Sequence, residues 1–334
     1  MSGAKGLSLL SGGLDSQLAV RVLQRAGAEM EAVCFETPFF SSAAARRAAA
    51  ALGVPLTVVD FTDDEIALVE NPPHGFGGAM NPCIDCHATM IRRAGEIMAE
   101  RGFDFVSTGE VMGQRPMSQN KQALGVVEKG SGLKGRLIRP LSALLLDPTI
   151  PEQEGLVDRS KLLDIHGRCR ERQIALAAEL GISEYPSPAG GCKLTEEGYG
   201  RKLKDLMNHE GLRTRRLVEL LNLARRFRLP SGAGVILGRD KDENTVLRGE
   251  TAVGTVLAPV NCPGPTALVP EVKSPDDDVA LVAEMVAAYS KCDRLEGDVK
   301  VKVVPKGAQD GAGEETVSPA RPYDRTKFME WQIC

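Results

Sequence analysis

The feature that most constrains this fold is a glycine pair between a short apolar segment and a helical pattern near the start of the chain. Residues 6–10 (GLSLL) are small and apolar, as in a buried strand, and Leu14 to Arg25 carry apolar residues at helical spacing. Between them stands SGGLDS. A strand that turns directly into a helix leaves several backbone N–H groups pointing at one spot, where the helix dipole adds positive charge. Gly12 and Gly13 let an anion approach this backbone closely, so the segment predicts a phosphate-binding turn.

The side chains of the turn add hydroxyl donors and one acid. Ser11 and Ser16 can donate hydrogen bonds to phosphate, and Asp15 can hold Mg²⁺ on a pyrophosphate group. The pattern is neither GxxxxGK[ST] nor GxGxxG. An ordinary glycine-rich turn is the alternative interpretation.

The following residues predict a parallel α/β sheet. Strands are expected at 31–35, 55–61 and 104–107, with a helix at 42–52 between the first two, and this alternation is typical of parallel sheets. Ligands bind such sheets at the carboxyl ends of the strands. Thr108-Gly109 follows the strand at 104–107, so this pair is expected to border the same crevice as SGGLDS, unless it is a plain turn.

SGGLDS resembles the PP-loop of the ATP pyrophosphatase superfamily, whose members adenylate a carbonyl oxygen and release pyrophosphate. The resemblance implies an adenine nucleotide α-hydrolase-like fold that uses ATP and Mg²⁺. The nucleotide-binding residues that it implies are Ser11, Gly12, Gly13, Leu14, Asp15, Ser16, Thr108 and Gly109, with Asp15 also catalytic.

Three cysteines stand in suggestive places. Cys83 and Cys86 form a CxxC at the expected start of a helix (88–101), where the helix dipole lowers thiol pKa values, and Cys192 follows in the glycine-proline loop Tyr185 to Thr195. A CxxC alone is consistent with half a zinc site, a redox pair, an iron–sulfur ligand pair or chance, and Cys192 alone with a buried core cysteine. Three cysteines with no evident fourth suit a 4Fe-4S cluster whose open iron carries sulfide. Cys83, Cys86 and Cys192 are therefore the expected metal ligands and catalytic thiols.

A basic stretch lies in the second half of a chain whose net charge is −4. Residues 201–228 contain nine basic and three acidic residues, on two expected helices that end near Met207 and Phe227. Such a cluster predicts contacts with RNA phosphates, or else ordinary solvated helix faces. The expected RNA-binding residues are Arg213, Arg215, Arg216, Arg225 and Arg226.

The chain of 334 residues divides into three predicted parts. Residues 1–185 form the parallel-sheet domain, residues 186–228 a cysteine loop with a basic helical linker, and residues 229–334 a small α+β domain. In the last part, strands are expected at 234–237 and 299–304 and a helix at 274–292.

The combination of SGGLDS, NPCxxC and the later lone Cys192 resembles the thiouridine-forming branch of the PP-loop superfamily, which includes the tRNA 2-thiouridylases and 4-thiouridine synthases. TGEVMGQRPMSQ, RPLSA…PTIPEQEG, GRCRERQ and YPSPAGGCKLT more closely resemble a bacterial PP-loop family described as thiouridine-synthase-like, and the C-terminal LGRDKDENTVL and CPGP resemble an NFACT-type RNA-binding domain. The resemblance implies ATP-dependent thiolation of a uridine in RNA, with tRNA as the expected partner and sulfide or a cysteine desulfurase as the sulfur donor. Sulfur transfer by a persulfide, resolved by a second cysteine as a disulfide, is the alternative to the cluster.

Two other functions remain open at this point. One is a PP-loop ligase that forms an amide or nitrile and uses the cysteines for a structural metal. The other is a non-catalytic RNA-binding protein that senses a nucleotide. The sequence has no apolar run of roughly 20 residues and no signal-peptide pattern, so a cytoplasmic protein without a membrane partner is expected.

Overall fold

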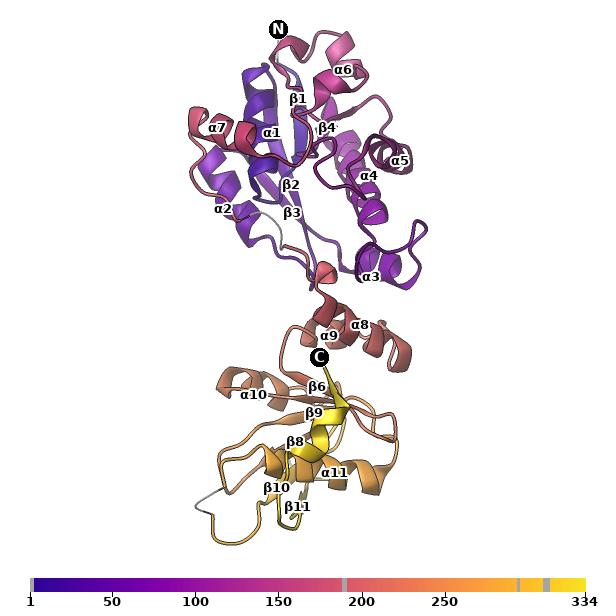
Figure 1. Cartoon of the computed structure of the whole chain (residues 1–334), viewed down its shortest axis with the longest axis vertical. Coiled ribbons are helices and arrows are strands. Elements are labelled where there is room, and N and C mark those ends of the chain that lie inside the picture. The colour runs from indigo at the N-terminus through magenta and orange to yellow at the C-terminus, as the bar shows by residue number, and fades with distance from the viewer. Residues whose placement is uncertain (1–2, 188–190, 293–294, 309–312) are drawn as a thin grey trace. The chain divides into compact units, whose positions relative to one another are not determined.

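The computed structural model describes residues 3–187, 191–292, 295–308 and 313–334. The chain divides into two compact units, Met1–Thr195 and Glu196–Cys334 (Figure 1). Pro188 and Gly190 of the predicted cysteine loop lie outside the described residues.

The first unit is built on a five-stranded sheet of described strands in the order β3-β2-β1-β4-β5. All neighbouring strands run parallel, with Gly6 of the central strand opposite both Met30 and Phe105. This confirms the predicted parallel α/β fold. The strands are β1 (Lys5–Leu9), β2 (Glu29–Glu36), β3 (Leu56–Asp60), β4 (Phe105–Ser107) and β5 (Leu137–Ile138).

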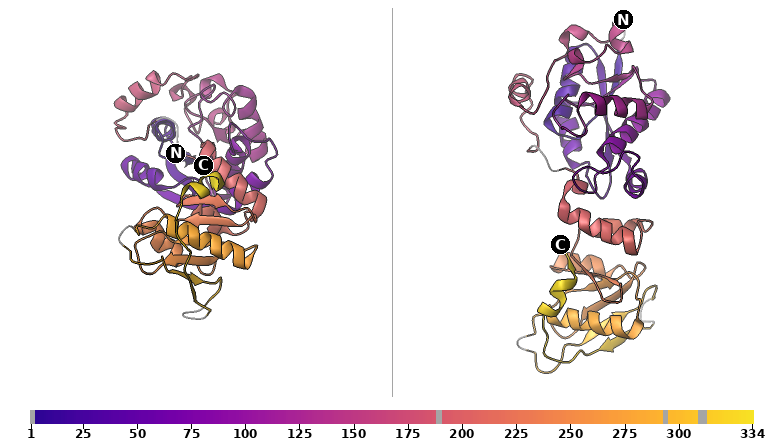
Figure 2. Two further views of the ribbon diagram at one scale, coloured as in Figure 1. Left: turned by 60° about the horizontal axis from the view of Figure 1, so that its bottom comes forward. Right: turned by 45° about the vertical axis from the view of Figure 1, so that its right-hand side comes forward.

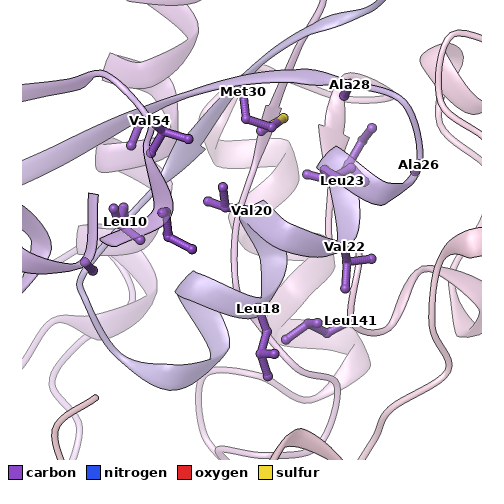
Figure 3. Packing of buried hydrophobic residues seen from close by; sticks show 14 of the residues in the cluster. Leu10, Leu18, Val20, Val22, Leu23, Ala26, Ala28, Met30, Val54 and Leu141 are labelled. Carbon is purple, nitrogen blue, oxygen red and sulfur yellow. The ribbon is translucent and has the colours of Figure 1, made fainter. Parts of the chain in front are cut away.

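Helices cover both faces of this sheet, because its strands bury apolar side chains on both sides. One core cluster joins α1, α2 and α7 and includes Ala177 of α7. Leu18 and Val20 of α1 belong to the same cluster (Figure 3). The other joins α4 and α5 to the opposite face, with Leu7 and Ile91 at its centre. The helices are α1 (Leu14–Arg25), α2 (Ala43–Leu52), α3 (Thr62–Glu70), α4 (Cys83–Arg101), α5 (Lys121–Ser131), α6 (Ile150–Gln153) and α7 (Glu171–Glu179), with 3₁₀ turns η1 (Ala143–Leu145), η2 (Arg159–Lys161) and η3 (Lys193–Thr195).

The second unit is a seven-stranded sheet of described strands in the order β11-β10-β8-β9-β7-β6-β12, and the pairings are antiparallel. Helix α11 buries Val282, Met285 and Val286 against this sheet and lies along it (Figure 2). The small α+β domain is therefore confirmed. Its elements are α8 (Glu197–His209), α9 (Arg215–Leu220), β6 (Arg225–Arg228), β7 (Gly234–Leu237), α10 (Lys241–Arg248), β8 (Thr255–Pro259), β9 (Ala267–Val269), α11 (Pro275–Ala288), β10 (Val301–Val304), β11 (Glu315–Val317), η4 (Thr326–Trp331) and β12 (Gln332–Ile333).

One predicted element is wrong. The second basic helix was expected to reach Phe227, but α9 ends at Leu220 and residues Arg225–Arg228 form strand β6. Ala224 between them has a φ of 65°, a left-handed conformation that interrupts a helix. Phe227 is fully buried in the sheet core. This burial favours the strand at Arg225–Arg228, and the helical pattern of the sequence does not predict it.

None of the helices in the described ranges is both long and apolar enough to cross a membrane.

Candidate functional site

The SGGLDS segment forms a tight turn between β1 and α1. Gly12 has a φ of +82°, and α1 begins directly after Gly13. Internal hydrogen bonds fix the loop: Ser16 Oγ donates to the Gly13 carbonyl at 2.8 Å, and Gln17 Nε2 donates to the Gly12 carbonyl at 2.9 Å. The N-cap Gly13 receives no side-chain cap, so the first N–H groups of α1 are left for an external acceptor. This is the geometry predicted for a phosphate-binding turn.

Two close backbone contacts explain why glycines are needed around this turn. A Cβ on Gly12 would lie 2.4 Å from the backbone carbon of Ala44 at the start of α2. A Cβ on Gly109 would lie 2.6 Å from the backbone carbon of Asp15 and the nitrogen of Ser16. The end of β4 therefore packs directly on the first turn of α1, as expected for neighbouring strand ends.

Asp15 is held by residues from two distant segments. Gln114 Nε2 donates to its Oδ2 at 2.8 Å, and an Arg170 guanidinium nitrogen lies 3.8 Å from the same oxygen. Gln114 belongs to the motif TGEVMGQRPMSQ, residues 108–119. Arg170 precedes α7 within the GRCRERQ motif, whose function the sequence alone did not indicate.

The three cysteines expected to act together lie within electrostatic reach of one another. Cys83 and Cys86 occupy the first turn of α4, and the pKa of Cys86 is affected by both Cys83 and Cys192. Cys192 is held in place because the Lys193 N–H donates to the Phe39 carbonyl at 2.9 Å. The fold thus brings thiols 106 residues apart into one neighbourhood.

The prediction that the helix start lowers the thiol pKa is wrong for Cys86. Burial, followed by the nearby Glu65 carboxyl, raises the pKa of Cys86 well above 9.0. Burial also raises the pKa of Cys192 to about 12, which Arg115 partly opposes. The helix dipole is outweighed here because desolvation strongly disfavours a thiolate.

Glu65 on α3 is a site residue that the sequence analysis missed. Its side chain is 1% exposed and hydrogen bonds to Cys86, and burial raises its pKa from 4.5 to about 7. Its Oε2 atom has no hydrogen-bond partner within the described part of the chain. Only the acidic start of α3 (TDDE) hints at it, and that pattern is typical of an ordinary helix N-terminus.

A buried ion-pair network lies between the cysteine helix and the strand ends. Glu110 follows the Thr108-Gly109 pair and contacts His87 Nδ1 at 3.0 Å and Arg139 Nε at 2.9 Å. Burial alone would raise the pKa of Glu110, but Arg139 and then His87 outweigh it, and the pKa falls from 4.5 to about 2. Glu110 is therefore ionised and ties α4, β4 and β5 together. Thr108 Oγ1 also lies 3.1 Å from this carboxylate.

The thiols are not arranged as a ready-made metal site. Among the residues that the structure describes, no group of three or more His, Cys, Asp or Glu side chains has the arrangement of a metal-ligand set. Three thiols are nevertheless the donor type that an iron–sulfur cluster requires.

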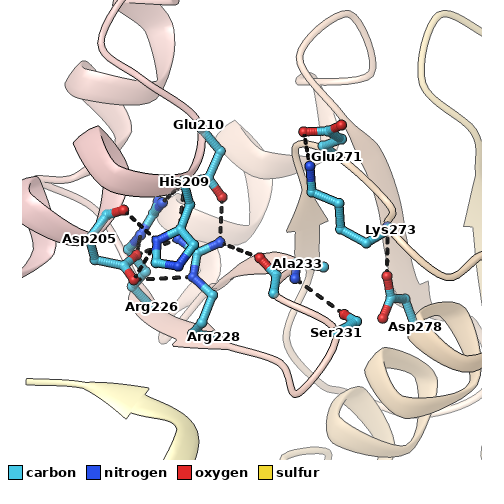
Figure 4. A network of polar contacts seen from close by, with 11 residues as sticks. Asp205, His209, Glu210, Arg226, Arg228, Ser231, Ala233, Glu271, Lys273 and Asp278 are labelled. Atoms are coloured by element: carbon cyan, nitrogen blue, oxygen red, sulfur yellow. Dashed lines mark hydrogen bonds and ion pairs between the residues drawn. The ribbon is translucent and has the colours of Figure 1, made fainter.

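The predicted RNA-binding arginines differ sharply in their surroundings. Arg226 is 3% exposed and pairs with Asp205 at 3.0 Å and Glu210 at 2.9 Å (Figure 4). Arg225 stacks on the Tyr289 ring. Arg215 and Arg216 form ion pairs, yet both side chains remain more than 40% exposed, and Arg213 is exposed.

Fold and site together describe a nucleotide-type α/β domain followed by an antiparallel-sheet domain. Residues 1–147 match the family model of the thiamine biosynthesis protein ThiI, and residues 224–329 match that of the NFACT protein RNA binding domain. These two matches confirm the resemblance seen in the sequence, to a ThiI-type PP-loop domain and to an NFACT-type RNA-binding domain.

Several curated relatives match the first unit. A probable tRNA sulfurtransferase of Caldanaerobacter subterraneus is 32% identical over 146 residues, which cover 41% of this chain and 36% of that protein. One from Halothermothrix orenii is 31% identical over 153 residues, with coverages of 43% and 36%. The chain thus matches about a third of the length of these relatives.

Two solved structures are similar in part. A complex of a 4-thiouridine synthetase with RNA and bound ATP has a TM-score of 0.38 and 22% identity, covering 65% of this chain and 52% of that one. The C-terminal part of a fibronectin/fibrinogen-binding protein from Streptococcus suis has a TM-score of 0.27 and 16% identity, covering 81% of this chain and all of that one.

Proposed function

We propose that this protein is an enzyme that uses ATP to thiolate a uridine in RNA, with tRNA as the substrate. The observation that carries this proposal is the placement of two consecutive residues. Gln114 hydrogen bonds to Asp15 of the glycine turn, and Arg115 is close enough to Cys192 to affect the pKa of its thiol. One short segment therefore borders both the nucleotide turn and the thiols. The names of the curated relatives support the same chemistry.

The first step is adenylation. ATP binds on residues 11–16 with Thr108 and Gly109 beside them, and Asp15 holds Mg²⁺. The uridine carbonyl oxygen attacks the α-phosphate, an O–P bond forms, and the α–β bond breaks to release pyrophosphate. The N–H groups at the start of α1 stabilise the negative charge that develops on the phosphates.

The second step introduces sulfur. A sulfur nucleophile forms the C–S bond, and AMP leaves with the former carbonyl oxygen. On the persulfide route one cysteine carries the sulfur as a persulfide. A second cysteine then forms a disulfide with the first cysteine, and the formation of this disulfide supplies the two electrons that the transferred sulfur needs. On the cluster route Cys83, Cys86 and Cys192 would hold a 4Fe-4S cluster, which would supply an iron that binds sulfide.

Glu65 fits the first of these routes directly. Its pKa of about 7 leaves the carboxyl partly ionised near neutral pH, and the ionised form can accept the proton of the Cys86 thiol, which burial otherwise keeps protonated, when a thiolate is needed. A cysteine desulfurase, which delivers sulfane sulfur, is the donor on the persulfide route, and sulfide is the donor on the cluster route. The NFACT-type unit binds the RNA.

The test is an assay with tRNA and Mg²⁺-ATP, supplied in separate reactions with sulfide or with a cysteine desulfurase and free cysteine, followed by mass spectrometry of the nucleosides. We expect AMP, pyrophosphate and one thiolated uridine from the wild type. Cys192→Ser should abolish thiolation while leaving ATP binding intact, and Cys169→Ser, an exposed cysteine, is the matched control. Release of AMP and pyrophosphate with no sulfur in the RNA would overturn the proposal in favour of a ligase.

Iron and acid-labile sulfide analysis of protein purified without oxygen separates the two sulfur routes. About four irons per chain, lost in the Cys83→Ser variant, supports the cluster. Thiolation by a protein that contains no iron, with the cysteine desulfurase as donor, supports the persulfide.

A further inference from the structure

Several polar side chains surround Asp15, and the glycine turn does not need them in order to form. Gln173 on α7 is fully buried, and its Nε2 lies 3.4 Å from Gln114 Oε1, which in turn holds Asp15. Arg170, at the N-cap of the same helix, lies near the same Asp15 oxygen that Gln114 contacts. Helix α7 packs against α1 in the core of the first unit, so these side chains are rigidly positioned.

The group is incomplete in its hydrogen bonding. Asp15 Oδ1, Arg170 Nε and Gln173 Oε1 are buried and have no hydrogen-bond partner within the described ranges. Buried polar atoms without partners are unfavourable, by about 1–3 kcal/mol each, and native proteins contain few of them. Three in one place, both donor and acceptors, indicate that a ligand with groups of both kinds completes the site.

The contact between Arg170 and Asp15 is too loose to be a structural latch. Their charged atoms are 3.8 Å apart, beyond hydrogen-bond distance, although both side chains are only 18% exposed. Two residues further along, the surface pair Arg172 and Asp164 closes to 2.6 Å despite exposures above 50%. Burial strengthens attraction between opposite charges, so a pair selected for stability should be the tighter of the two.

We propose that Arg170 binds the β- and γ-phosphates of the nucleoside triphosphate and stabilises the departing pyrophosphate, with Gln173 positioning Gln114 and Asp15. This rests on the proposed function. Mg²⁺ bound to phosphate supplies partners for two of these three atoms, because the cation suits the Asp15 carboxylate and the phosphate oxygens accept from the guanidinium. As the bond between the α- and β-phosphates breaks, its electron pair moves to the pyrophosphate oxygen. The negative charge beside Arg170 is then greater than in bound ATP.

The test compares three ligands on the full-length protein by titration calorimetry. Arg170→Gln should bind Mg²⁺-ATP and Mg²⁺-pyrophosphate roughly 10- to 100-fold more weakly than the wild type and bind AMP unchanged. Arg170→Lys, which keeps the charge but not the forked geometry, should recover part of the pyrophosphate affinity. Arg172→Gln removes an exposed arginine from the same helix and should behave as the wild type.

The outcomes separate this inference from the proposed function. If Arg170→Gln weakens AMP as much as ATP, or weakens neither, Arg170 is no phosphate ligand, and RNA thiolation still stands. If the ATP-specific loss occurs but the wild type never thiolates RNA, the phosphate subsite stands and the proposed function fails. If the wild type binds no ATP, both are overturned.

Discussion

At the scale of single residues, the site depends on glycines, which have no side chain, as much as on residues with functional side chains. Gly12 and Gly109 admit the backbones of α2 and α1 at distances where a Cβ would collide with main-chain atoms. Main-chain atoms cannot move aside as a flexible side chain can, so these contacts are strict. Ion pairs and buried carboxyls then set the charge of the surroundings.

A Gly109→Ala variant tests the first of these statements. We expect a loss of ATP-dependent pyrophosphate release on the order of 10²-fold, because the new methyl group displaces the backbone at Asp15. Gly125→Ala, on an exposed face of α5 with open space around it, is the control and should raise stability by about 0.5–1 kcal/mol. Pyrophosphate release at the wild-type rate from Gly109→Ala would contradict the packing of β4 on α1.

The Glu110 carboxylate predicts how the first unit responds to acid. Its pKa is about 2 in the folded state and about 4.5 when unfolded, so the unfolded chain binds the extra proton as the pH falls. The stabilisation, about 3 kcal/mol, is fully present above roughly pH 5 and is lost as the pH falls from 4.5 towards 2.

Amide hydrogen exchange in β1 measures this effect, because the single tryptophan, Trp331, reports only on the second unit. Glu110→Gln should be less stable at neutral pH but nearly independent of pH between 2 and 4.5. An identical slope in both proteins would show that the ion pair with Arg139 does not form.

At the scale of elements, neighbouring strand ends and helix starts do most of the assembly in the first unit. The loops after β1 and β4 meet because these strands pair in parallel, and α4 carries the CxxC at its first turn. In the second unit, α8 is joined to β6 by a buried network in which Asp205 and Glu210 face Arg226 and Arg228 (Figure 4). That network explains why a cluster of arginines in the sequence is only partly available for RNA.

Removing one member of this network should be costly. Arg226→Met leaves two carboxylates buried with a single arginine, and we expect a loss of about 3–5 kcal/mol in the free energy of unfolding. Urea unfolding followed by Trp331 fluorescence measures it. Arg215→Met removes an exposed ion pair with Glu219 and should cost less than about 1 kcal/mol. Equal losses in the two variants would mean that the network contributes no more than a surface pair.

At the scale of the whole molecule, the chain combines two units that each have their own hydrophobic core. The first contains every residue of the proposed nucleotide and thiol sites, and the second contains the exposed arginines at 213–216. Since the second sheet recruits strands from Arg225 to the C-terminus and α11 covers it, this unit has what it needs to fold alone.

A fragment of residues 196–334 tests this independence. We expect it to unfold cooperatively, with Trp331 as the probe, and to bind tRNA with an affinity that falls as salt rises. Replacing Arg213 and Arg215 with Glu should reduce the slope of log K against log salt by roughly 0.7–0.9 per lost phosphate contact. If the folded variant fragment binds tRNA as the wild-type fragment does, Arg213 and Arg215 are ordinary surface residues that do not contact RNA.

The sequence alone determined the local chemistry of this protein. Apolar periodicity placed β7 and α1 at their observed bounds, and SGGLDS identified the turn, because these features depend on residues within one or two turns of the chain. Tertiary structure decided what local pattern does not encode. Burial turned a basic helical pattern into β6, paired Arg226 internally and raised the pKa of Cys86 where a helix start alone would lower it. Only folding brought Glu65 to Cys86 and Arg170 to Asp15, since desolvation and long-range charge act between residues that the sequence holds far apart.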